Sequence, residues 1–154
     1  APEIKKQAMA DAVEYEGYIP VIFASEHLSG NAQILRNQFN ETSKSFSSCF
    51  LIPDLNHHLM EGLAFPKHHV LKFIILNSTN FSEKITKRVQ LTTDVVEKNM
   101  FEVAELNFGG ENVYEDFILT LSYGSYLTLF LGLIHEQNPA VNPWVDWFKE
   151  ELAK

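Results

Sequence analysis

Cysteine is almost absent from this chain of 154 residues, in which Cys49 is the single example. One thiol excludes a disulfide within the chain and a zinc site built from several cysteines. Sparing use of cysteine is typical of proteins from a reducing compartment. We therefore expect a cytoplasmic protein.

Basic residues are also scarce. The chain has 12 Lys and Arg against 20 Asp and Glu, which gives a formal net charge of −8 at pH 7. No cluster of basic residues interrupts this negative balance. Because nucleic acids and acidic membrane surfaces are themselves negative, we expect neither of them as a partner.

Long uninterrupted apolar runs are missing as well. The first residues, Ala1 to Lys6, lack the apolar core of a secretion signal, and the missing initiator Met indicates processing or a fragment of a longer chain. The most apolar stretch, Phe117 to Ile134, is interrupted by Ser, Thr and Gly and is bracketed by charged residues and His135. We predict that it forms a helix in a protein interior or interface rather than a membrane span.

Short apolar segments alternate with helical patterns along the chain. Strands are predicted at 18–24, 47–52, 70–76 and 101–106, the first two buried; helices at 3–16, 31–43, from 80 or 82 to 98, 112–137 and 144–153; and one or two helical turns within 56–62. This alternation predicts right-handed βαβ crossovers. Residues 1–154 are thus expected to form one α/β domain, a three-layer αβα sandwich with a mostly parallel sheet of about four or five strands.

Glu41 lies near the end of the predicted helix 31–43. The helix dipole disfavours a negative charge there, which suits a carboxylate that acts as a general base near neutral pH. Lys44, three residues later, opposes this effect. Taken alone, Glu41 is more simply explained as a surface residue paired with Lys44 at helical spacing.

His57 follows the second predicted strand, sixteen residues after Glu41, where open α/β folds place chemistry. A histidine can move protons near neutral pH, although a lone one is more often a capping or hydrogen-bonded residue. The pairs His57-His58 and His68-His69 raise the question of a metal site. Adjacent side chains of an extended segment point to opposite faces, so we expect no metal.

The turn from Ser25 to Asn31 brings hydroxyl groups and Gly30 to the start of a helix. Free N–H groups at a helix start can hold an anion such as a sugar phosphate. Ser and Asn are also the usual helix caps, so this turn has two explanations.

Three segments together resemble the C-terminal half of the bifunctional phosphoglucose/phosphomannose isomerases, a family built from two tandem sugar-isomerase (SIS) domains. They are Gln38-x-Asn40-Glu41-x-x-Lys44, the loop Ile52-Pro53-Asp54-Leu55-Asn56-His57, and the closing segment from Val145 to Leu152. Their order and spacing span nearly the whole chain.

The resemblance implies an SIS-like, flavodoxin-type fold and the interconversion of glucose 6-phosphate or mannose 6-phosphate with fructose 6-phosphate through a cis-enediol, without a cofactor. By the same resemblance, Glu41 is the base that moves a proton between C2 and C1, His57 assists ring opening, and Lys149 holds and polarises substrate oxygens. We expect contacts with the substrate from four further residues: Ser25, Asn31, Asn40 and Asn56.

The family's N-terminal SIS domain carries the Ser/Thr-rich loop that grips the phosphate, so the resemblance implies that this chain needs that domain for turnover. It also implies a homodimer in which the histidine reaches the partner's site, with the helix around Tyr123 to Ile134 as a domain or subunit interface. Such an enzyme would belong to carbohydrate metabolism, in glycolysis. The alternative is a non-catalytic SIS-like module that binds sugar phosphates for regulation or assembly.

Overall fold

A parallel sheet of four strands forms the centre of the computed structural model, which describes residues 2–66 and 70–154. The strands are β1 (Ile19–Ala24), β2 (Ser48–Leu51), β3 (Leu71–Leu76) and β4 (Glu102–Leu106), and they lie in the order β2-β1-β3-β4 with parallel pairings throughout. Each one falls within a segment in which the sequence predicts a strand.

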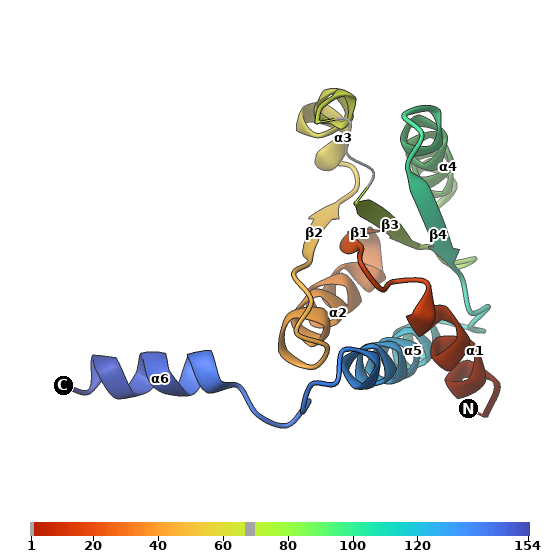
Figure 1. Ribbon diagram of the computed structural model, residues 1–154. Helices are drawn as coiled ribbons and strands as arrows, with labels where there is room; N and C mark the ends of the chain where they lie inside the picture. Colours follow the sequence, from red (N-terminus) through yellow and green to blue (C-terminus); the bar gives the residue numbers. More distant parts are fainter. Residues whose placement is uncertain (1, 67–69) are drawn as a thin grey trace.

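Helices cover both faces of the sheet (Figure 1). One layer holds α1 (Pro2–Val13), α2 (Ser29–Glu41) and α5 (Val113–Ile134), and the opposite layer holds α3 (Leu55–His58), the 3-10 helix η2 (Met60–Ala64) and α4 (Glu83–Lys98). A short 3-10 helix, η1 (Glu26–Leu28), precedes α2, and α6 (Pro143–Leu152) follows α5. The predicted three-layer αβα sandwich is confirmed.

The two central strands, β1 and β3, carry most of the core of the sheet. Their side chains are almost all buried, and the rings of Phe23 and Phe73 lie 5.2 Å apart between their centroids. Strand β2 has a neighbour on one side, and its side chains are half-buried. The prediction of a buried strand there is wrong because β2 is an edge strand, a position that depends on the strand order and not on local pattern.

Helix α5 packs along α1 and α2 on one face of the sheet. Tyr123, Leu127 and Leu131 are fully buried, and the Tyr123 hydroxyl donates to Asp11 of α1 over 2.7 Å. By length and composition α5 could cross a membrane. Its contacts with α1 and α2 agree instead with the predicted helix in a protein interior.

Two glycines let α5 approach α2 closely. A Cβ atom at Gly124 would lie 2.9 Å from a methyl group of Leu35, and one at Gly132 would lie 2.8 Å from the carbonyl oxygen of Thr42. A leucine side chain can move aside, whereas the backbone at the end of α2 has little freedom. Gly132 therefore sets how closely the last turns of α5 support the end of α2.

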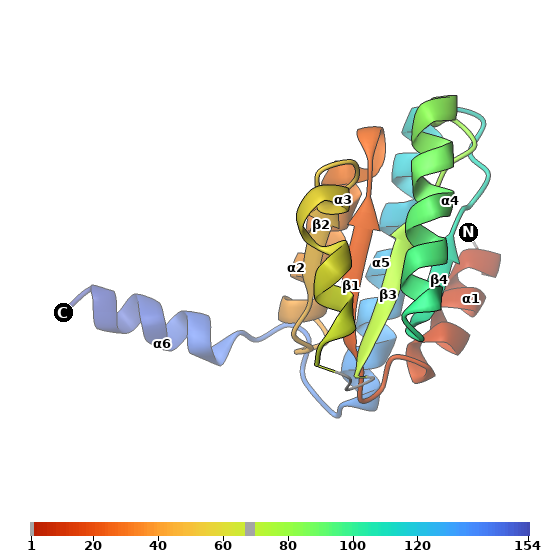
Figure 2. The ribbon, with the colours of Figure 1, turned by 90° about the horizontal axis from the view of Figure 1, so that it is seen from above.

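Helix α6 stands apart from the rest of the fold (Figure 2). It begins at Pro143, one residue before the predicted range 144–153, and none of its residues is buried. Trp144, Trp147 and Phe148 are all more than half exposed. The helix is thus a projecting arm, joined to α5 by residues 135–142.

The close contact at Gly132 predicts the effect of Gly132→Ala. The added methyl group would overpack the contact with α2, and we expect the free energy of unfolding to fall by about 1–3 kcal/mol in urea denaturation. Gly30→Ala is the matched control, since Gly30 is also helical but has open space where a Cβ would be. It should be neutral or stabilising by about 0.5–1 kcal/mol, and equal stabilities of the two variants would contradict the close approach.

Candidate functional site

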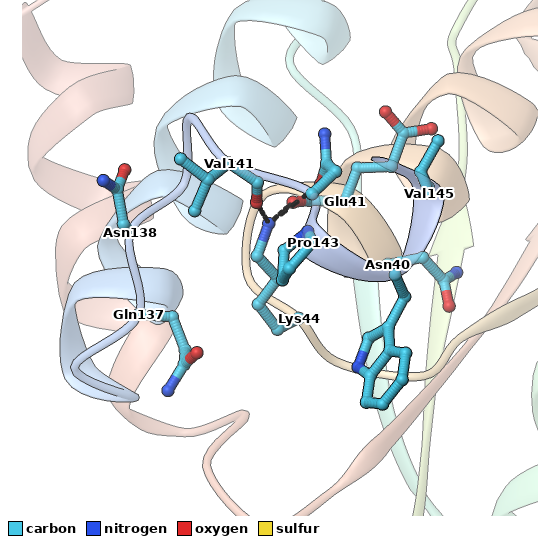
Figure 3. A pocket seen from close by; sticks show the side chains of 10 residues that line it. Asn40, Glu41, Lys44, Gln137, Asn138, Val141, Pro143 and Val145 are labelled. Atoms are coloured by element: carbon cyan, nitrogen blue, oxygen red, sulfur yellow. Dashed lines mark hydrogen bonds between the residues drawn. The ribbon is translucent and has the colours of Figure 1, made fainter. Parts of the chain in front are cut away.

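A hollow of about 360 Å³ lies between the end of α2 and the segment that leads into α6 (Figure 3). Its lining residues come from these two places: Asn40, Glu41 and Lys44 on one side, and Gln137, Asn138, Val141, Asn142, Pro143, Trp144 and Val145 on the other. A volume of this size suits a small molecule. Segments far apart in the sequence therefore meet in one candidate site, and Glu41 lies on it.

Lys44 joins the two sides of the hollow. Its ammonium group donates to the Val141 carbonyl oxygen over 2.6 Å, to Asn142 Oδ1 over 3.0 Å and to the Glu41 carbonyl oxygen (Figure 3). These three acceptors match the three protons of the group. Lys44 thus binds the backbone of Glu41, and not the carboxylate with which the sequence pattern paired it.

The backbone at the end of α2 is held from the other side by α5. The Nδ1 atom of His135, directly after α5, donates to the carbonyl oxygen of Ser43 over 2.9 Å. Lys44 has a left-handed backbone with φ of 57°, which turns the chain away from the helix. Glu41 is left exposed beside the hollow, on backbone that is fixed at both sides.

Asn40 and Lys149 differ in how they relate to the hollow. Asn40 lines it, and its Nδ2 atom donates to the Arg36 carbonyl oxygen over 2.8 Å and to Ser47 Oγ over 2.9 Å, which ties α2 to the residue before β2. Lys149 is exposed on α6 and does not line the hollow.

His57 is separated from Glu41 by the sheet. It lies in α3, on the opposite face, just after the carboxyl end of β2, whereas Glu41 ends the helix that leads back to the amino end of β2. His57 is exposed, and Asn56 beside it donates from Nδ2 to Thr92 of α4 over 2.9 Å. Within one chain the structure does not bring Glu41 and His57 together.

Ser25 and Asn31 lie at the carboxyl end of β1 and are both buried. Ser25 Oγ donates to the carbonyl oxygen of Ile52 over 2.8 Å, and Asn31 Nδ2 donates to that of Phe117 over 2.9 Å. These bonds fasten the turn after β1 to β2 and α5. The two residues therefore have structural contacts, and contact with a substrate stays a prediction.

Sequence reasoning missed a buried polar cluster around Asp116, in the first turn of α5. Its carboxylate accepts hydrogen bonds from His27, Ser78, Asn80 and the N–H of Gly110. Burial opposes ionisation, but these hydrogen bonds outweigh it and hold the pKa of Asp116 below its usual value. The available signal is an acidic residue directly before the apolar stretch 117–134, where the sequence pattern by itself predicts only a charged flank.

Within residues 2–66 and 70–154, no group of three or more His, Cys, Asp or Glu side chains is placed to hold a metal ion. His57 and His58 are consecutive residues of α3, and His58 Nε2 lies 3.2 Å from Asp54 Oδ2. The other pair considered in the sequence, His68 and His69, lies outside the described residues.

Comparison with known proteins gives a consistent set of relatives. The family model for the bacterial phospho-glucose isomerase C-terminal SIS domain matches residues 4–152. The bifunctional phosphoglucose/phosphomannose isomerase of Aquifex aeolicus is 29% identical over 98% of this chain, and that of Caldicellulosiruptor bescii is 23% identical over 99%. These alignments cover 48% and 46% of the relatives, so the chain spans about half their length.

Solved structures with the same fold include a glucose-6-phosphate isomerase like protein from Thermus thermophilus, with a TM-score of 0.65, 17% identity, and coverage of 86% of this chain and 42% of that one. The C-terminal domain of glucosamine-fructose-6-phosphate aminotransferase from Francisella tularensis has a TM-score of 0.68 at 8% identity, and covers 89% of this chain and 40% of that one. At these identities the likeness shows the fold alone.

The contacts of Lys44 predict what its removal does to the hollow. Lys44→Met keeps the length of the side chain and removes the charged donors, so the segment before α6 should open more often. A hydrogen bond to a charged group contributes about 1.5–3 kcal/mol to stability. Its loss should make the backbone amides of this segment exchange at least about tenfold faster. Hydrogen–deuterium exchange followed by mass spectrometry should show this in peptides that cover residues 137–145.

Peptides from α4 serve as the internal reference in this measurement, because α4 lies on the opposite face of the sheet. Unchanged exchange at 137–145 would show that Lys44 does not hold the segment.

Proposed function

Because the chain belongs to the bacterial phospho-glucose isomerase C-terminal SIS domain family, we propose that it is the C-terminal half of a phosphoglucose/phosphomannose isomerase. The reaction is the interconversion of glucose 6-phosphate or mannose 6-phosphate with fructose 6-phosphate. The observation that carries the proposal is the exposed carboxylate of Glu41 beside the hollow, in a chain matched by the family model over residues 4–152. The parent protein would act in carbohydrate metabolism in the cytoplasm.

In the proposed mechanism, Glu41 is the general base. Its carboxylate removes the proton from C2 of the open-chain aldose while the aldehyde oxygen gains a proton, which gives the cis-enediol. Glu41 then returns its proton to C1 as the hydroxyl on C2 loses its own, and the ketose results. A base for this step must reach the substrate and keep its position; Glu41 is exposed, on backbone held by Lys44 and His135.

Lys149 would hold and polarise the oxygens on C1 and C2 in this mechanism. It lies about one turn after Val145, the last residue of α6 to line the hollow. The apolar residues of α6 are exposed within this chain. We propose that α6 packs against the additional half present in the longer isomerases, and that this packing positions Lys149.

His57 would assist ring opening in the site of a partner subunit. The sheet separates it from Glu41 of its own chain, and it is exposed on the far face. A homodimer that places α3 of one subunit near the end of α2 of the other would complete both sites, since a twofold axis creates two equivalent contacts. The non-catalytic alternative, a module that only binds sugar phosphates, needs neither Glu41 nor His57.

The first test of this proposal is Glu41→Gln in the intact gene product that carries these residues. The amide keeps the shape of the side chain and removes the base, so kcat for fructose 6-phosphate should fall by at least about 10²-fold to 10⁴-fold. Glu97→Gln is the matched control, an exposed glutamate on α4, and should keep full activity. Equal rates in both variants would exclude Glu41 as the base, whereas sugar-phosphate binding without turnover in the unaltered protein would support the binding module.

A second test asks whether His57 acts across a dimer. Glu41→Gln and His57→Ala chains are each expected to be inactive as homodimers. In a mixed dimer one site would combine an intact Glu41 from one chain with an intact His57 from the other. Purification through two different tags after co-expression selects the mixed dimer, in which one of the two sites is intact, so about half of the unaltered activity should be restored.

Two results would argue against a site shared between subunits. One is a mixed dimer without recovered activity. The other is a His57→Ala homodimer as active as the unaltered protein.

A further inference from the structure

The strand order of the sheet marks a second place where a ligand could bind. In the order β2-β1-β3-β4, the connection from β1 leads to one edge and the connection from β3 to the other. Open α/β folds bind their ligands at such a reversal, in the crevice beyond the carboxyl ends of the two strands. The residues that follow β1 and β3 therefore line the expected crevice, and it is distinct from the hollow beside Glu41.

Hydrogen-bond donors converge in this crevice. His27 follows β1, and Ser78 and Asn80 follow β3. Ser78 Oγ donates over 2.5 Å, Asn80 Nδ2 over 2.9 Å and His27 Nε2 over 3.1 Å, all to one oxygen, Asp116 Oδ2.

The other carboxylate oxygen, Asp116 Oδ1, accepts from the backbone N–H of Gly110 over 3.0 Å. Four donors from three separate loops thus surround one buried carboxylate.

The fit around the carboxylate is tight. A Cβ atom at Gly110 would lie 2.5 Å from Asp116 Oδ1, so a side chain at this position would displace the carboxylate. Asp116 itself is 3% exposed, so its carboxylate is enclosed by these donors. The donors of the crevice are thus taken up by a group of the chain itself.

A second carboxylate covers the neighbouring start of α4. Glu26 Oε1 accepts from Ser82 Oγ over 2.7 Å, and Glu26 Oε2 from the Ser82 N–H over 3.4 Å. Ser82 is the N-cap of α4, where free N–H groups attract anions. Glu26 adopts a left-handed backbone with φ of 45° at the position that makes this contact.

We propose that the crevice at the carboxyl ends of β1 and β3 is an oxyanion site that the chain fills with its own carboxylates, Asp116 inside and Glu26 at the mouth. The class of ligand that fits the donors is a small oxyanion such as a carboxylate or an inorganic phosphate. In the unaltered protein this site is closed to such ligands. One consequence rests on the proposed function: the phosphate of a sugar substrate must be gripped outside this crevice.

The test empties the site and offers a replacement anion. Asp116→Ala removes the carboxylate and leaves the donors, so sodium formate should raise the melting temperature saturably by a few degrees, beyond sodium chloride at equal ionic strength. Asp116→Asn is the matched control, because its amide still fills the space and should show no difference between the two salts. Asp146→Ala, on the exposed α6, controls for loss of a carboxylate elsewhere. An Asp116→Ala protein that responds equally to both salts would overturn the proposal.

A measurement on the unaltered protein decides the question if Asp116→Ala does not fold. The amide resonances of Gly110 and the Asn80 side chain should not shift during titration with millimolar inorganic phosphate. A saturable shift of both would show an open site and would overturn the proposal. Neither readout uses isomerase activity, so the result is independent of the tests of Glu41 and His57.

Discussion

The packing of α5 across α1 and α2 is the interaction on which the rest of this structure depends. The helix has 22 residues and is about 33 Å long. It contacts both α1 and α2, the other two helices on this face of the sheet. Its first turn carries Asp116 into the crevice beyond β1 and β3. Its last turns support the end of α2 through Gly132 and lead to the segment clamped by Lys44. One buried helix therefore positions two separate polar sites.

The two ends of the fold differ in the environment of their carboxylates. At the carboxyl ends of the strands, the carboxylate of Asp116 is buried and fully paired, so its ionised form is stabilised and the loops are held together. Beside the hollow, Glu41 is exposed, while the Lys44 ammonium group that could have paired with its carboxylate binds two backbone oxygens and Asn142 Oδ1 instead. Fixed backbone with an exposed carboxylate is what a base that must meet a substrate requires.

Apolar side chains are exposed on two helices of the chain, α5 and α6. Val145, Trp147 and Phe148 of α6 are exposed, as is Ile118 of α5. Exposed apolar side chains gathered on one element mark contact surfaces more often than free surface. The longer isomerases that this chain matches have about as much sequence again.

Local pattern was enough to predict the elements, because helices and strands are decided mainly by the spacing of apolar residues and by caps within a few positions. The parallel sheet and the closing helix near residues 144–153 followed from residues close together in the sequence. The edge position of β2, the separation of Glu41 from His57 and the burial of Asp116 did not. Each depends on strand order or on helix packing between segments tens of residues apart, so only the tertiary structure could decide them.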